Sequence, residues 1–193
     1  MRPSQLGSPL ALALSIALPS GLAAAPCDSP IQNPIVCEST RPGNPSSGWD
    51  VSGSGDATIQ GLATEISVNH GQTVRFEIGT PATSSDLDID RMGYDAGSGA
   101  RKVAANVLPS ATSPQAQPAC LTDAASGLSD SGNWGESASW VVPANAVSGI
   151  YFARLVRNDT LESRHVVFIV RDDEGHSPSY FFAFYKAYVG SKG

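Results

Sequence analysis

The sequence predicts an all-β protein whose strands form a two-layer sandwich. Short alternating stretches of apolar and polar residues, separated by turns, number about seven over roughly 110 residues. The 19 glycines, 14 prolines and only 16% charged residues are typical of a loop-rich β protein rather than a helical bundle. The segment SGIYFA, residues 148–153, places Gly149, Tyr151 and a small residue at the spacing of a tyrosine corner. We therefore expect an immunoglobulin-like β-sandwich with an extended N-terminal arm.

The N-terminus predicts export from the cytoplasm. Arg2 precedes the short apolar run LALALSIAL, and small residues follow at Ala23 to Ala25, which is the organisation of a secretory signal peptide. The apolar run is about half the length of a membrane span, so we expect no such span and a secreted or periplasmic protein. The predicted divisions are a signal peptide (1–25), a Pro-rich arm (26–48), the sandwich (49–172) and a divergent aromatic tail (173–193).

The three cysteines are interpreted in the light of that export. Cys27 and Cys37 are close in sequence and flank two prolines, so a disulfide that closes this small loop is the expected pairing. Cys120 is then left as an unpaired thiol. The alternative is that all three are packed or reduced thiols.

The strands are expected at residues 62–68, 73–78, 86–90, 101–107, 134–142, 150–156 and 164–171. In the third strand Leu87 and Ile89 alternate with three aspartates, which predicts carboxylates that face water. Arg91 falls on the apolar side, so we expect it to leave the sheet or to pair with Asp88 or Asp90. The apolar run 166–170 predicts a strand that is covered on both faces.

No catalytic or metal site is predicted, and no cofactor. The three histidines have no zinc-type spacing, and the serines near Gly127 do not meet the nucleophile-elbow pattern. The acidic run 172–174 with His176 is more typical of a solvated turn than of a cation site. A net charge of -6, with scattered basic residues, disfavours nucleic acid as a partner.

Ligand binding is the remaining possibility, and loops are its usual location in a β protein. The loop around residues 90–101 carries acids, bases and an aromatic side chain. Trp49, Trp134 and Trp140 could form a sugar-stacking platform, although core and corner packing is the more common role of tryptophan in a β domain. The predicted ligand-binding residues are Asp90, Arg91, Tyr94, Arg101 and Trp134. The sequence does not define an oligomeric state.

Several motifs in combination carry a family resemblance. They are NPIV (33–36), PGNP (42–45), WDVSGSGDATIQG (49–61), LDIDRMGY (87–94), GARKVA (99–104), QPACLTDAASGL (117–128), SGNW (131–134) and VRDDEGHS (170–177). Over residues 33–177 the chain resembles the N-terminal region of secreted bacterial proteins related to the large (beta) subunit of N,N-dimethylformamidase. The resemblance implies a β-sandwich that precedes a separate catalytic domain, which holds the iron ligands and is absent here.

Three departures from that family pattern matter. Family members often read Gly-Tyr-Tyr-Gly-Gly where this chain has residues 93–97 as GYDAG, so any aromatic surface there is reduced. They tend to have a cysteine at the position of Ser131, which would be the natural partner of Cys120. After Ser177 the resemblance is expected to stop, as it would in a truncated or frameshifted gene product.

The sequence thus favours a secreted accessory or binding module, without catalytic machinery of its own, for a glycan or a protein ligand. One alternative is a fragment of an amidase-like hydrolase that acts only with its missing domain. Another is a structural spacer within a cell-surface protein.

Overall fold

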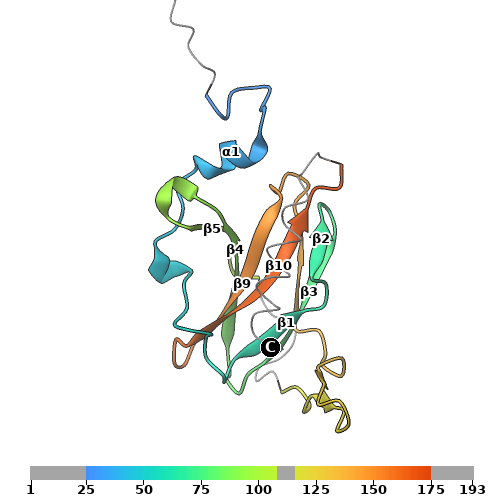
Figure 1. Ribbon diagram of the computed structural model, residues 1–193. Helices are drawn as coiled ribbons and strands as arrows, with labels where there is room; N and C mark the ends of the chain where they lie inside the picture. Colours follow the sequence, from blue (N-terminus) through green and yellow to red (C-terminus); the bar gives the residue numbers. More distant parts are fainter. Residues whose placement is uncertain (1–24, 108–115, 175–193) are drawn as a thin grey trace, which may run out of the picture.

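The computed structural model describes residues 25–107 and 116–174 (Figure 1). The predicted signal peptide, apart from Ala25, and almost all of the predicted aromatic tail lie outside these residues. The described part contains one α-helix, α1 (Pro34–Ser39), and two 3-10 turns, η1 (Ser46–Gly48) and η2 (Asp95–Gly97). Its strands are β1 (Gln60–Ala63), β2 (Ser67–Asn69), β3 (Thr73–Gly79), β4 (Ser85–Met92), β5 (Ala100–Ala104), β6 (Leu121–Thr122), β7 (Ser129–Asp130), β8 (Ala138–Val141), β9 (Gly149–Arg157) and β10 (Ser163–Arg171).

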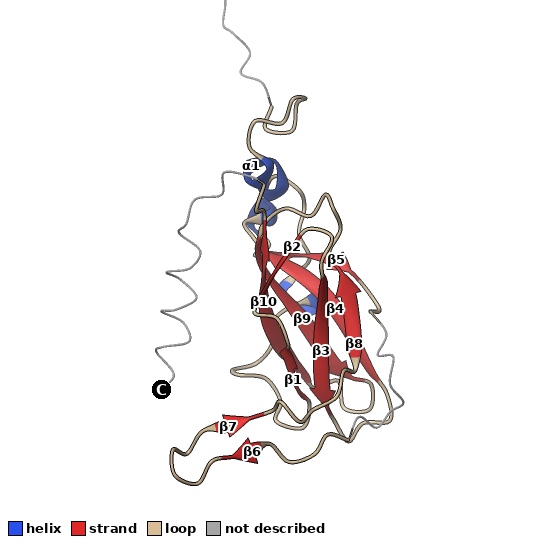
Figure 2. Cartoon of the chain, turned by 90° about the vertical axis from the view of Figure 1, so that its right-hand side faces the viewer, coloured by secondary structure: helices blue, strands red, loops and turns tan. Residues whose placement is uncertain are grey.

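The strands form the expected sandwich. One sheet has the order β1-β3-β8 and the other the order β2-β10-β9-β4-β5, and β2 runs parallel to β10 while the other pairs are antiparallel. In the described residues the two layers therefore hold eight strands instead of about seven. The short strands β6 and β7 pair only with each other, in a hairpin that projects from one end of the sandwich (Figure 2). The all-β sandwich prediction is confirmed.

The core is made by the alternate side chains that face the other sheet. Phe76 of β3 packs against Phe168 of β10 with ring centroids 5.7 Å apart, and Tyr151 of β9 lies 5.8 Å from the same ring. Aromatic contacts at these separations add to the stabilisation that burial alone provides. Further buried members of this core are Ile59, Val68, Val74, Ile78, Leu87, Ile89, Ala138, Val142, Ala153, Leu155, Val166 and Val170.

The tyrosine corner is present. The hydroxyl of Tyr151 donates a hydrogen bond of 2.6 Å to the backbone oxygen of Val147, four residues earlier. Because the donor is in β9 and the acceptor is in the loop before it, the bond ties the corner to the sheet. This is the relationship that the spacing in SGIYFA predicted.

One predicted strand is divided. The stretch 62–68 forms β1 and β2, which belong to different sheets. Between them the Thr64 amide donates to the Arg75 oxygen of β3, and the Ile66 oxygen accepts from Ile169 of β10, so the chain changes sheets there. Ile66 is 57% exposed at this crossing. The alternation that predicted one strand holds on both sides of the switch, which is why the sequence does not reveal it.

The N-terminal arm is only partly extended, because residues 34–39 form α1. The side chain of Asn33 caps this helix by accepting from the amides of Ile35 and Val36. The predicted disulfide between Cys27 and Cys37 is present and joins the arm's first residues to the helix, whereas Cys120 is free and exposed. The disulfide prediction is therefore confirmed.

The arm continues along the outer face of the five-stranded sheet. The Trp49 ring lies 6.3 Å from the Phe152 ring of β9, and the Nε2 of His165 donates to the Trp49 backbone oxygen at 2.6 Å. Burial lowers the pKa of His165, although this hydrogen bond acts in the opposite direction. The lowered pKa favours the neutral ring. Trp49 thus anchors the arm. Val167 of β10 remains 38% exposed, so the arm covers only part of this face and the prediction of a fully covered last strand is wrong there.

The strand β4 departs from the expected pattern at its end. Asp86 and Asp88 are partly exposed, but Asp90 is completely buried, and the prediction that all three carboxylates face water is wrong for Asp90. Asp90 lies opposite Phe152 in the β4–β9 ladder, on the face that Trp49 covers. The β4–β5 register also shifts between Ile89 and Asp90. The docked arm, rather than the strand period, decides the burial of this carboxylate.

Candidate functional sites

The loop between β4 and β5 is tightly wound. Asp95 and Ala96 have φ angles of 42° and 54°, values that non-glycine residues rarely adopt. The arm packs against the loop, since the Gly43 amide donates to the backbone oxygen of Asp95 at 3.1 Å. Tyr94 at its tip is 71% exposed, while the Asp95 side chain is completely buried. Backbone strain of this kind persists only where the surroundings enforce it.

Arg91 lies beneath this loop and is also buried. It stays in β4, and its guanidinium donates to the backbone oxygens of Val147 at 3.4 Å and Ser148 at 3.1 Å. Arg91 therefore neither leaves the sheet nor forms an ion pair with Asp88 or Asp90 in the described part of the chain. Its guanidinium packs over Gly149, where a Cβ atom would come within 3.2 Å of Nη2. The glycine of the SGIYFA motif is needed for this close approach.

Two buried carboxyl groups lie close to Arg91 in the sequence. Neither carboxylate oxygen of Asp90 or of Asp95 accepts a hydrogen bond within the described residues. Burial raises the pKa of Asp90 to about 6, although Lys102 and Arg154 favour its charged form. Burial likewise raises the pKa of Asp95, and nearby Arg91 opposes the shift. Burial thus disfavours the charged form of both carboxyl groups, and neither side chain is exposed to a ligand.

A small hollow lies where α1 meets the edge strand β5. Glu38 of α1 is only 3% exposed and forms ion pairs with Arg101 of β5 and with Arg41, whose Nε lies 3.3 Å from Oε2. The hollow has a volume of about 180 Å³. Its other lining residues are Val103, Trp140, Pro143, Asn145, Ala146, Val147 and Tyr151.

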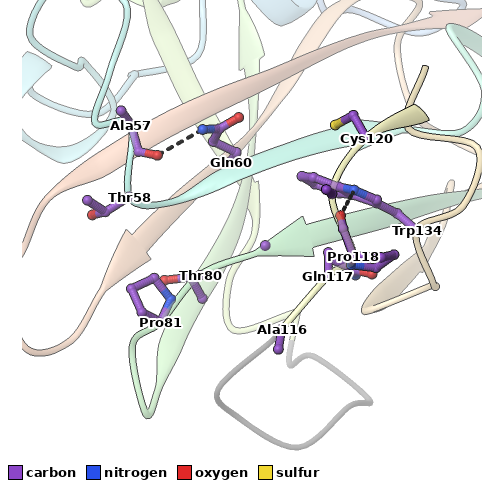
Figure 3. A pocket seen from close by; sticks show the side chains of 12 residues that line it. Ala57, Thr58, Gln60, Thr80, Pro81, Ala116, Gln117, Pro118, Cys120 and Trp134 are labelled. Atoms are coloured by element: carbon purple, nitrogen blue, oxygen red, sulfur yellow. Dashed lines mark hydrogen bonds between the residues drawn. The ribbon is translucent and has the colours of Figure 1, made fainter. Parts of the chain in front are cut away.

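A larger groove, of about 700 Å³, lies near the hairpin β6–β7 (Figure 3). Trp134 and residues 116–120 line one side, and residues at the start of β1 and the end of β3 line the other. The full lining is Ala57, Thr58, Gln60, Gly79, Thr80, Pro81, Ala116, Gln117, Pro118, Ala119, Cys120 and Trp134. The lining contains no Asp, Glu, Lys, Arg or His side chain.

Gln117 builds one wall of this groove. Its amide nitrogen donates to the backbone oxygens of Ile78 and Gly135, at 3.2 and 2.9 Å, and its oxygen accepts from the Gly135 amide. Trp134 is fixed by a hydrogen bond of 3.0 Å from its indole nitrogen to the Pro118 oxygen. The ring lies against Gly79, where a Cβ atom would come within 3.2 Å of it. The groove is therefore held by local hydrogen bonds before any ligand arrives.

The five residues predicted to bind a ligand do not form one site. Asp90 and Arg91 are buried, Tyr94 is exposed at the loop tip, Arg101 lines the small hollow and Trp134 lines the groove. The three tryptophans also contact different residues. Trp49 packs on Phe152 and Trp140 on Tyr151, which is the core and corner role.

Sequence reasoning missed Glu38, Arg41 and Gln117. The Glu38 and Arg41 pair has the helical i, i+3 spacing, a signal that was available but weak. The pairing of Glu38 with Arg101, 63 residues later, has no local signal. Gln117 stands in a Pro-rich connection that carries no strand period.

In the described ranges, His, Cys, Asp and Glu side chains form no group of three that could hold a metal ion. Asp173 of the acidic run instead pairs with Arg171 at 3.0 Å, and His176 lies outside the described residues. Among the described helices, none has the length and apolar character needed to cross a membrane.

The topology and the tyrosine corner define an immunoglobulin-like β-sandwich domain. The chain belongs to the family described as N,N-dimethylformamidase beta subunit-like, C-terminal, which matches residues 86–189. This is the family that the motifs indicated. The match begins at β4 rather than in the arm and continues past Ser177, where the resemblance was expected to stop, and its description refers to a C-terminal rather than an N-terminal region. No curated protein matches the chain.

Proposed function

We propose that the protein is an exported, non-catalytic binding module that takes a neutral glycan in the groove beside Trp134. The observation that carries the proposal is the lining of this groove, which combines one large aromatic ring with amide, hydroxyl and small apolar groups and has no Asp, Glu, Lys, Arg or His. A charged ligand would lose its hydration there without gaining an ionic partner. An uncharged polar ligand does not meet that cost.

The chemistry of a sugar ring suits such a lining. The apolar C–H face of a pyranose stacks on an indole ring, and its hydroxyls exchange hydrogen bonds with amide side chains at the rim. Gln60 is placed for this role, because its Nε2 donates to the Ala57 oxygen at 2.9 Å and so fixes the amide at the groove. Preformed sites of this kind lose little conformational entropy on binding. The disulfide between Cys27 and Cys37 supports export to an oxidising compartment.

The test is a glycan array probed with the full chain, followed by titration of the best neutral oligosaccharide. Trp134→Ala should weaken binding at least about tenfold, since the stacking platform is lost. Gly79→Ala, which pushes a methyl group against the indole ring, should weaken it in the same direction without removing the aromatic side chain. Tyr94→Ala is the matched control, because this exposed aromatic residue lies outside the groove lining.

Two results would contradict the proposal. One is the absence of any saturable glycan binding. The other is binding that Tyr94→Ala abolishes and Trp134→Ala leaves unchanged, which would return the ligand site to the loop between β4 and β5. A positive signal on a protein array alone would favour a protein ligand.

The family match favours a second candidate, a non-catalytic part of an amide hydrolase. The description of the family refers to the beta subunit of N,N-dimethylformamidase. In this role the chain would support catalysis by another domain or by a partner. Hydrolysis of small formamides by the purified chain alone would overturn both proposals, because each assigns no catalytic group to it.

A further inference from the structure

We infer that the hollow between α1 and β5 is a second binding site, which takes a small monocarboxylate with a flat apolar body. The site is independent of the proposed glycan groove, since the two share no lining residue. The arm contributes Glu38 and Arg41, β5 contributes Arg101 and Val103, and the sandwich contributes Trp140 and Tyr151.

The charges at this hollow favour an anion. Glu38 is 3% exposed and supplies one negative charge between the two guanidinium groups of Arg41 and Arg101. The cluster therefore has a local charge of about +1, in a chain whose net charge is -6. A buried carboxylate that orients two arginines is costly to fold unless its partners hold it firmly.

Guanidinium donors remain for a ligand. Arg41 contacts Glu38 through Nε, and neither of its terminal nitrogens is hydrogen-bonded to a described residue. Arg101 contacts Glu38 through one terminal nitrogen only. The planar arrangement of N–H donors in arginine matches the two oxygens of a carboxylate. A monocarboxylate would add the second negative charge that balances the pair of arginines.

The opposite wall of the hollow and its volume indicate the apolar body of the ligand. Val103, Trp140 and Tyr151 are apolar or aromatic, and the Tyr151 hydroxyl is already committed to the Val147 oxygen. A volume of about 180 Å³ corresponds to roughly six water molecules of liquid. Such a space suits a single ring or a short chain, and benzoate is a suitable probe.

A purely structural clamp is the competing explanation. The Glu38–Arg101 pair alone is enough to fasten α1 to β5. Arg41 is 56% exposed, lines the same hollow and keeps donors that the clamp does not use. If the hollow is a ligand site, the loss of Arg41 weakens ligand binding. If the cluster is only a clamp, the loss of Arg41 has no such effect.

The experiment is a titration of the full chain with benzoate, and with neutral benzamide as the matched ligand, followed by calorimetry or by NMR shifts. Arg41→Gln should weaken benzoate binding at least about fivefold, because it removes an ionic donor. Arg41→Lys should recover only part of the affinity, since lysine keeps the charge but not the planar fork. Val103→Phe should weaken binding by filling the hollow while leaving every charge in place.

Arg75→Gln is the control, because Arg75 is similarly exposed (48%) and paired with two acids, Glu65 and Glu136, on the other sheet. The site requires that benzoate binds, that benzamide binds at least about tenfold more weakly, and that Arg75→Gln has no effect. The absence of saturable benzoate binding overturns the inference. So does binding that Arg41→Gln and Val103→Phe both leave unchanged, which would identify the Glu38 cluster as a clamp only. If Val103→Phe does not fold, the Arg41 pair of variants decides the question.

Discussion

The hydroxyl of Tyr151 and the backbone oxygen of Val147 are joined by a hydrogen bond of 2.6 Å, and the Nε of Arg91 donates to the same oxygen at 3.4 Å. One carbonyl of the loop before β9 thus holds two buried side chains from neighbouring strands. Burial raises the pKa of Tyr151, while the two nearby arginines, Arg91 and Arg101, oppose the shift. The corner is therefore the point where the loop, the neighbouring strands β4 and β9 and the small hollow meet.

Removal of this hydroxyl should destabilise the fold measurably. Tyr151→Phe keeps the ring in the core and deletes only the hydrogen bond, so we expect a loss of about 1 kcal/mol in the free energy of unfolding. Urea denaturation followed by tryptophan fluorescence measures this difference. Tyr94→Phe, at the exposed loop tip, is the control and should leave the midpoint unchanged. Equal stability of both variants would mean that the corner bond contributes nothing net.

The arm should be sensitive to a single methyl group at Gly43. A Cβ atom there would lie 2.5 Å from the Cβ of Ser98 and 2.6 Å from the backbone oxygen of Ala100. Gly43→Ala must therefore push the arm away from β5, at a cost of about 1–3 kcal/mol. Hydrogen exchange at the Lys102 amide, which donates to the Asn44 side chain at 2.7 Å, reports this displacement.

Gly48→Ala is the matched control for that experiment. Gly48 lies in the same arm, and the nearest atom to its added Cβ would be 4.0 Å away. We expect unchanged exchange at Lys102 in this variant. Faster exchange in both variants would point to a general loosening of the arm rather than to a clash at Gly43.

What the sequence could predict was local in the chain. The tyrosine corner spans four residues and the disulfide ten, so motif and spacing were sufficient. The burial of Asp90 depends on an arm that docks on it from more than 40 residues earlier, and no strand period contains that information. The same is true of both hollows, because Glu38 meets Arg101 and Gln117 meets Gly135 only after the sandwich has formed. Sequence patterns therefore defined the fold better than they defined the sites.

The hairpin β6–β7 should accept an engineered disulfide. The Sγ of Cys120 lies 3.3 Å from the Oγ of Ser131, at the base of the hairpin. In Ser131→Cys we expect a bond between the two sulfurs, which adds about 2 kcal/mol of stability to this region. Thiol titration of the oxidised, denatured variant should find no free thiol, whereas the parent chain and Ser131→Ala should each show the single thiol of Cys120. Two free thiols in the variant would contradict the geometry.

Stability should depend on pH through Asp90. Its pKa is about 6 in the folded protein, against 3.8 for a free side chain, so the folded state holds the proton more tightly. As pH rises from about 4 to about 6 the unfolded chain loses this proton first, and the contribution of Asp90 to stability falls. Above pH 6 the full penalty of the buried charge remains.

Asp90→Asn removes that penalty because the amide carries no charge. We expect the variant to match the parent chain near pH 4 and to exceed its free energy of unfolding by about 1–3 kcal/mol at pH 7. Urea unfolding at a series of pH values measures the difference, and the titration of Asp95 cancels because both proteins contain it. Glu162→Gln, which replaces an exposed acid, is the control. A constant difference between Asp90→Asn and the parent chain at all pH values would show that Asp90 does not titrate as a buried acid.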